Sequence, residues 1–132
     1  MANDRPRFAA VGAGRMGRGI AIAFAYAGHR ISLVDLRQRS DEAWQKLRGE
    51  ARAEIEGSLA GLARLGVIDA AQVAAIAARV EFVGAADAPS ALGAAELLFE
   101  GVPETLEAKR EAFDWLNRHC RDDAIITSTT SS

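Results

Sequence analysis

The sequence is poor in cysteine, histidine and long apolar runs, and each shortage excludes a class of protein. A single cysteine, Cys120, cannot form an internal disulfide, so a disulfide-stapled secreted fold is excluded and a reducing cytoplasm is expected. The apolar stretch over residues 20–27 is far shorter than the roughly 20 residues that cross a bilayer, so no membrane segment is predicted. The histidines, the cysteine and the acids show no spacing typical of a metal site, and none is predicted.

Positive charge is not in excess either. The 16 lysines and arginines are outnumbered by 18 aspartates and glutamates, which gives a formal net charge of -2. Because a nucleic-acid surface needs a dense basic patch, no nucleic-acid partner is expected. With 49% hydrophobic and 26% charged residues in 132, the composition is that of one globular domain able to bury a core.

Short apolar runs alternate with longer helical patterns along the whole chain. Strands that are buried on both faces appear in a sequence as continuous apolar runs, and strands separated by helices form parallel sheets. The runs that we predict as strands are residues 8–11, 31–34, 80–83, 97–99 and 124–127. The alternation therefore predicts an α/β fold with a mostly parallel sheet.

The predicted helices follow from apolar spacing and from capping residues. A long helical excursion after the second strand is expected to begin near Asp41, capped by Ser40 or Asp41, and to bury one stripe. The stripe consists of Trp44, Leu47, Ala51, Ile55, Leu59 and Leu62. Asp69 and Gln72 predict a capping box that opens a second helix, running through Ala78.

A later helix is predicted after the fourth strand. Pro103 suits its first turn, and Phe113 and Leu116 are expected on its buried side.

A glycine-rich turn follows the first predicted strand. Gly12, Gly14 and Gly17 have the G-x-G-x-x-G spacing, which is weak evidence alone but stronger between a strand and an apolar helix. We expect Gly12 to allow a tight turn, Gly14 to let the backbone approach a pyrophosphate, and Gly17 to let the helix pack on the strand. The N–H groups at the start of the helix favour phosphate binding. The alternative is a structural turn without a ligand.

Asp35 closes the second predicted strand, where an acid can accept hydrogen bonds from both ribose hydroxyls of an adenosine. A carboxylate there repels a 2′-phosphate, so NAD is favoured over NADP as the cofactor. Arg37 is the opposing signal, because an arginine in this loop can meet a 2′-phosphate. With the glycine turn, these residues predict a Rossmann-type, doubly wound sheet with a long helical excursion after its second strand. The alternative for Asp35 is a solvated loop acid.

The glycine turn is richer than the general fingerprint. The segment G-A-G-R-M-G-R-G-I-A, followed by A-G-H before the second strand and V-D at its end, resembles the 3-hydroxyacyl-CoA dehydrogenase family. The resemblance implies that Arg15 and Met16 contact the cofactor together with the glycines. It also implies an extended helical hairpin after the second strand.

Two later segments resemble the same family in the same order. In E-G-V-P-E-T-L-E-A-K, residues 100–109, the resemblance implies cofactor contacts for Gly101, Val102, Glu104 and Lys109. An exposed acid and a solvated lysine are the alternative for the last two.

The second of these segments is T-S-T-T-S-S, residues 127–132. Here Ser131 corresponds to the serine that hydrogen-bonds the 3-oxygen of the substrate. Thr129 stands at the position of a cofactor-contacting asparagine, and threonine lacks the paired donor and acceptor of an amide.

The resemblance implies an NAD-dependent enzyme that oxidises the 3-hydroxyl of a 3-hydroxyacyl-CoA, such as 3-hydroxybutyryl-CoA, to the 3-keto form in fatty acid metabolism. In the family the histidine base lies after the T-S-S segment, in a catalytic and dimerisation domain absent from this chain. His29 and His119 precede that segment, so residues 1–132 alone are expected to form one NAD-binding domain without activity. A homodimer is expected for the full-length protein.

Two alternatives stay open at this point. E-G-V-P-E is also similar to carnitine dehydrogenase and to the lambda-crystallin-type gulonate dehydrogenase, which oxidise other 3-hydroxy compounds. A non-catalytic dinucleotide-binding module is the second alternative.

Overall fold

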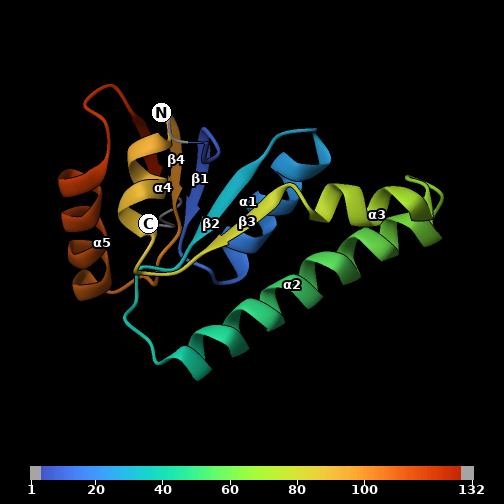
Figure 1. The fold of residues 1–132 in the computed structure, drawn as a ribbon, viewed down its shortest axis with the longest axis horizontal. Helices are drawn as coiled ribbons and strands as arrows, with labels where there is room; N and C mark the ends of the chain where they lie inside the picture. Colours follow the sequence, from blue (N-terminus) through green and yellow to red (C-terminus); the bar gives the residue numbers. More distant parts are fainter. Residues whose placement is uncertain (1–3, 129–132) are drawn as a thin grey trace.

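The computed structural model describes residues 4–128, which form a five-stranded parallel sheet in the order β3-β2-β1-β4-β5 with helices on both faces (Figure 1). The strands are β1 (Phe8–Val11), β2 (Ile31–Val34), β3 (Val80–Val83), β4 (Leu97–Glu100) and β5 (Ile125–Ser128). The helices are α1 (Arg15–Tyr26), α2 (Asp41–Arg64), α3 (Ala70–Ala77), α4 (Ala88–Ala94) and α5 (Leu106–His119). The predicted Rossmann-type fold is confirmed.

The core lies in two layers, one on each face of the sheet. On one face α4 and α5 contribute Ala91, Leu92 and Leu116, which pack with Val11 of β1 and other sheet residues. On the other face α1, α2 and α3 pack against the alternate residues of β1, β2 and β3. Because both layers cover them, β1 and β2 are the most deeply buried strands of the described sheet.

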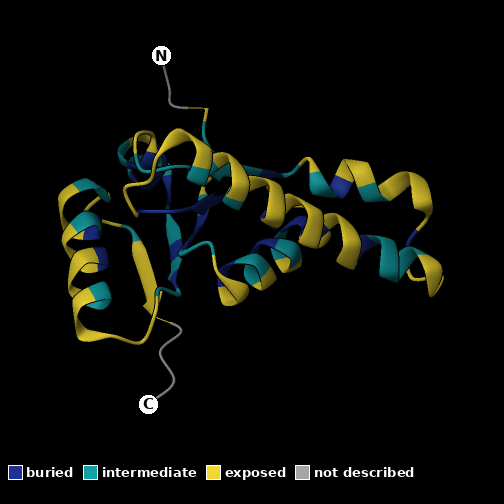
Figure 2. Ribbon diagram, turned by 90° about the horizontal axis from the view of Figure 1, so that it is seen from below, coloured by how far each residue is buried: buried dark blue, intermediate teal, exposed yellow. Residues whose placement is uncertain are grey.

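The predicted strands agree closely with the structure, and one differs in burial. β1, β2 and β3 have the predicted bounds, while β4 and β5 each end one residue later than predicted. β5 pairs with β4 at the edge of the described sheet and is exposed along its whole length (Figure 2). Ile125 and Ile126 are 63% and 38% exposed, so the expectation of burial on both faces is wrong for this strand within residues 4–128.

The helical excursion after β2 consists of α2 and α3, which lie side by side and extend away from the sheet (Figure 1). Ser40 caps α2 by accepting a hydrogen bond from the N–H of Ala43 at 3.1 Å. The predicted capping box of α3 is present, and the N–H of Asp69 donates to Oε1 of Gln72 at 2.8 Å. Of the predicted stripe on α2, only the middle is fully buried: Ala51, Ile55 and Leu59.

Three helix predictions need correction. Pro103 lies before α5, because the helix begins at Leu106 after Thr105, whose hydroxyl accepts from the N–H of Ala108. Phe113 is exposed, because α5 buries the positions four residues apart at Ala112 and Leu116, and Phe113 lies one step further around the helix. The helix after the glycine turn is expected over the apolar residues 20–27, but in the structure it already begins at Arg15 and ends at Tyr26.

α4 was not predicted. Its seven residues are too few to display a helical period, and its alanines give little contrast between the buried and exposed faces.

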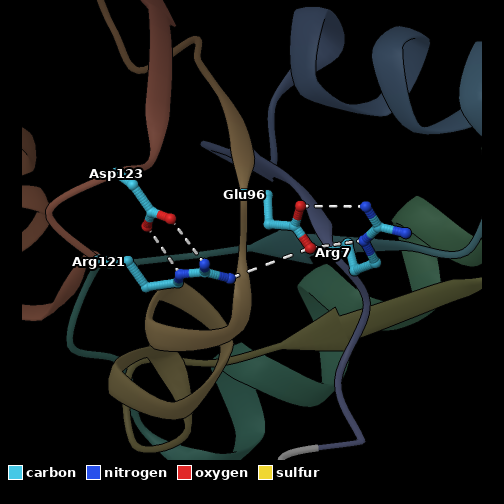
Figure 3. A network of polar contacts seen from close by, with 4 residues as sticks. All are labelled: Arg7, Glu96, Arg121 and Asp123. Atoms are coloured by element: carbon cyan, nitrogen blue, oxygen red, sulfur yellow. Dashed lines mark hydrogen bonds and ion pairs between the residues drawn. The ribbon is translucent and has the colours of Figure 1, made fainter.

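A polar network joins three segments at the amino ends of the strands (Figure 3). Arg7 donates to Glu96 at 2.6 Å, and Arg121 donates to Asp123 at 2.8 Å and lies 3.9 Å from Glu96. These ion pairs lower the pKa values of Glu96 and Asp123, chiefly through the arginine hydrogen bonds. Exposed pairs of this kind contribute little to stability, so this end of the sheet is held mainly by strand pairing.

Residues 4–128 contain no helix with the length and apolar character needed to span a membrane.

Candidate functional site

The carboxyl ends of β1 and β4 meet at the centre of the sheet, where the chain changes direction. β1 continues through α1 to β2 on one side, whereas β4 continues through α5 to β5 on the other. In open parallel sheets this switch point leaves a crevice above the strand ends, and ligands bind there. The predicted glycine turn follows β1 at this edge.

Two of the glycines in the turn are required by the fold itself. Gly12 has φ +104°, which disfavours any other residue, and its N–H donates to the carbonyl of Val34 at 2.7 Å. A Cβ at Gly12 would lie 2.9 Å from the carbonyl oxygen of Gly101, and one at Gly17 would overlap the carbonyl oxygen of Gly12. The tight turn and the close packing predicted for these two glycines are therefore confirmed.

Gly14 differs from both because, among residues 4–128, no atom outside its own chain neighbours and helix backbone lies close to it. It is the exposed N-cap of α1, with φ −84°, and a Cβ built on it would meet nothing within 4 Å. Within the described part of the chain, the N-cap of α1 makes no side-chain capping hydrogen bond. The start of a helix carries a positive partial charge, so the space beside Gly14 suits a phosphate group.

Arg15 and Met16, the first two residues of α1, are also exposed, and the side chain of Arg18 contacts the backbone of the glycine turn. Arg18 Nε donates to the carbonyl of Ala13 at 3.0 Å, and its Nη1 donates to Glu54 of α2 at 3.0 Å. Arg18 thus connects the glycine turn to α2.

Gly101 and Val102, far from the glycine turn in sequence, lie directly against it. The N–H of Gly101 donates to the carbonyl of Val11 at 2.8 Å, and the backbone of both residues packs on Gly12. The structure therefore brings together two of the segments that the sequence singled out.

Asp35 lies just after β2 and is almost fully buried, at 6% exposed. Its N–H donates to the carbonyl of Val83 at 2.8 Å, which fixes the backbone at the strand end. Its carboxylate accepts from Arg39, at 2.5 Å from Nε to Oδ2 and 3.4 Å from Nη2 to Oδ1. The solvated loop acid that was the alternative for Asp35 does not fit this burial.

An open pocket of about 400 Å³ lies beside Asp35. Its walls come from the loop after β2, from the start of α2 and from the segment after β3. The ring of Trp44 forms one wall, 3.3 Å from where a Cβ on Gly84 would stand. The volume is within the range of small-ligand pockets.

On the other side of the switch point, the carboxylate of Glu100 is fully buried at the end of β4. It accepts from Lys109 at 2.7 Å, from the hydroxyl of Ser128 at 2.7 Å and from the N–H of Val102 at 2.8 Å. Burial acts to raise the pKa of Glu100, but these hydrogen bonds and the charge of Lys109 outweigh it and lower the pKa. Glu100 therefore stays ionised.

Lys109 lies between two acids, because Oε1 of Glu104 is 3.6 Å from the Nζ atom that binds Glu100. Lys109 is largely buried while Glu104 is exposed, so the solvated lysine of the alternative is wrong and the exposed acid is correct. Thr129 and Ser131 lie outside the described residues.

Sequence reasoning missed Glu100, Arg39 and Ser128, and it took Trp44 only as part of an apolar stripe. An acid that ends an apolar run was a usable signal for Glu100, since it repeats the pattern of Asp35 after β2. Within residues 4–128 no group of three or more histidines, cysteines and acids is placed to hold a metal ion.

The comparisons with known proteins agree with this geometry. Residues 7–132 match the family model described as 3-hydroxyacyl-CoA dehydrogenase, NAD binding domain. The chain is 36% identical over 125 residues to the lambda-crystallin homolog of Bos taurus, covering 93% of this chain and 36% of that protein. It is 31% identical over 130 residues to the mitochondrial hydroxyacyl-coenzyme A dehydrogenase of Rattus norvegicus, covering 92% and 38%.

Among solved structures, the (S)-3-hydroxybutyryl-CoA dehydrogenase of Ralstonia eutropha superposes with a TM-score of 0.78 at 31% identity. The match covers 96% of this chain and 42% of that one. The chain thus spans somewhat more than a third of the length of these proteins.

Proposed function

Because the chain belongs to the 3-hydroxyacyl-CoA dehydrogenase family through its NAD-binding domain, we propose that it binds NAD along the carboxyl edge of the sheet for a hydroxyl-oxidising enzyme. The open space at the exposed start of α1 carries this proposal, because a side chain at Gly14 would fill it. The residues around it fit the cofactor: a free helix N-terminus suits a pyrophosphate, and a buried acid at the end of β2 suits a ribose.

The first half of the site comes from the glycine turn after β1 and from the end of β2. Gly12 and Gly17 shape the turn, Gly14 leaves room for the pyrophosphate, and Arg15 and Met16 border it. Asp35 accepts the ribose hydroxyls, and the pocket beside it takes the adenine. These roles are supported by the positions of the residues around one crevice.

The second half of the site comes from the loop after β4. Gly101 and Val102 present backbone to the crevice, and Glu104 and Lys109 border it. Glu100 neutralises Lys109, so this side of the crevice carries little net positive charge. Thr129 is proposed to contact the cofactor.

The chemistry that NAD supplies is the acceptance of a hydride. Ser131 is proposed to hydrogen-bond the 3-oxygen of the substrate, but a hydroxyl at neutral pH is too weak a base to remove the proton. We therefore propose that a histidine base lies in a further catalytic and dimerisation domain, for which the greater length of the relatives leaves room.

For the substrate we propose a 3-hydroxyacyl-CoA, such as 3-hydroxybutyryl-CoA. The matched family model and the solved relatives named for such substrates support this choice. A second candidate is a 3-hydroxy compound without coenzyme A, such as gulonate or carnitine. It is favoured by the higher identity to a lambda-crystallin homolog, 36% against 31% for the rat mitochondrial enzyme.

The chain is expected to bind NADH more tightly than NADPH, because Asp35 accepts ribose hydroxyls and disfavours a 2′-phosphate. Asp35→Ala should narrow this preference by removing both effects, and NADH affinity should fall about tenfold with the lost hydrogen bonds. Titration calorimetry with both nucleotides measures each change. Equal or tighter binding of NADPH by the unaltered chain would contradict the role of Asp35.

Activity should depend on sequence beyond the 132 residues. In an assay of NADH absorbance with acetoacetyl-CoA, the 132-residue chain is expected to bind NADH without turnover, since general-base assistance is worth about 10²–10⁴-fold. A protein that continues into the H-F-x-N-P segment, in which the resemblance places the family's histidine base, should turn over, and Ser131→Ala in it should slow the reaction sharply. A longer protein that reduces no acetoacetyl-CoA would move the substrate toward gulonate or carnitine. A stop codon after Ser132 would favour a binding module.

A further inference from the structure

The carboxylate proposed to hold the ribose already has a partner in this chain. Arg39 donates to both oxygens of Asp35, at 2.5 Å and 3.4 Å, and the two side chains are 27% and 8% exposed. A charge-assisted pair that is partly shielded from water is stronger than a fully exposed one. The negative charge of Asp35 is thus largely balanced before any ligand arrives.

Two further arginines line the pocket beside this pair. Arg37 and Arg48 line it together with Arg39, and the acids of the lining are Asp35, Asp41 and Asp87. Of the three arginines, Arg39 binds the ribose-site carboxylate, and Arg37 lies two residues before it in the same exposed loop.

We propose that Arg39 determines how strongly this domain discriminates between NAD and NADP. This inference rests on the proposed function, since it needs Asp35 at the ribose. The guanidinium of Arg39 neutralises Asp35, the acid that would repel a 2′-phosphate, and it can donate a hydrogen bond to that phosphate. The preference for NAD is therefore moderate in this chain.

The geometry leaves the carboxylate able to serve both partners. A carboxylate has about four acceptor positions on its two oxygens, and Arg39 takes Oδ2 closely while its contact to Oδ1 is long. Ribose hydroxyls can therefore bind Asp35 while Arg39 stays in place. Removing the arginine should alter NADH binding little, but it would leave a bare carboxylate beside a 2′-phosphate.

Arg39→Gln tests this inference, with Arg37→Gln as the matched control in the same loop. In Arg39→Gln, NADPH affinity should fall at least tenfold while NADH affinity stays within about threefold, so the ratio of the two dissociation constants widens. Arg37→Gln should change that ratio less than threefold. Arg39→Lys keeps the charge and should recover part of the NADPH affinity. Calorimetry gives the constants, and thermal melting without ligand confirms that each variant is folded.

The possible outcomes distinguish the role of Arg39 from the proposed NAD-binding function. If the unaltered chain binds NADH but Arg39→Gln leaves the ratio unchanged, or Arg37→Gln widens it equally, the role of Arg39 is overturned and the proposed function stands. If the unaltered, folded chain binds neither nucleotide, the proposed function is overturned, and the role of Arg39 with it.

Discussion

Gly14→Val is expected to abolish NADH binding, with affinity falling more than a hundredfold, while the protein stays folded. A Cβ at Gly14 would meet no atom of residues 4–128 within 4 Å, and its φ of −84° is accessible to any residue, so a valine is expected to fit the fold. That same side chain would occupy the place proposed for the pyrophosphate. The melting temperature should fall by only a few degrees, because valine is a poorer N-cap than glycine. Calorimetry with NADH and thermal melting measure the two effects.

Gly57→Val is a matched control for the exchange of glycine by valine. Gly57 lies on the exposed face of α2 with open space around it, and the variant should bind NADH as the unaltered chain does.

Gly17→Ala, in contrast to Gly14→Val, should unfold the protein, because its Cβ would overlap the carbonyl oxygen of Gly12. Undiminished NADH binding by folded Gly14→Val would place the cofactor elsewhere.

Glu100→Gln is expected to destabilise the protein by about 3 kcal/mol, at the lower end of the range for breaking a buried ion pair. The carboxylate is fully buried and both of its oxygens accept hydrogen bonds, so an amide would turn an NH₂ group toward one of the donors. Lys109 would also lose its closest counter-charge, although it is 17% exposed and can regain some hydration. For a domain of this size the melting temperature should fall by about 10 °C.

The control for this variant is Glu104→Gln, which alters the exposed acid 3.6 Å from the same lysine and should change the melting temperature by about 2 °C or less. The effect of Glu100→Gln should also depend on pH. Because the pKa of Glu100 is lowered in the folded state, its stabilisation is present above the ordinary glutamate pKa of about 4.3 and is lost as pH falls further. The two melting curves should therefore converge below about pH 4. Equal stability at pH 7 would show that the buried pair adds nothing.

The strands and the turns between them were accessible from the sequence because a buried parallel strand leaves a short, continuous apolar run. β1 and β2 were predicted to the residue for this reason. α4 was missed because seven residues rich in alanine show no period, and Phe113 was misplaced on the buried side of α5, which is formed by Ala112 and Leu116. The second error concerns which face of a helix meets the core, which depends on neighbours that a single sequence does not identify.

The candidate site was predictable where one segment is enough to define a role. The glycine turn and Asp35 each lie in a local strand context that fixes their position. The Glu100 cluster joins residues from β4, α5 and β5, and no local pattern shows that these elements meet. The pairing of Arg39 with Asp35 depends on the path of a loop between β2 and α2, which propensities leave open.

The three glycines of the fingerprint turn out to carry unequal information about ligands. Gly12 and Gly17 are in contact with backbone atoms, so the fold would demand them even in a descendant that had lost its cofactor. Among the described residues, no neighbouring atom would prevent a side chain at Gly14. A related sequence can keep this fold and lose the ability to bind a dinucleotide. In such a sequence, the position of the middle glycine is therefore the one at which a substitution is expected.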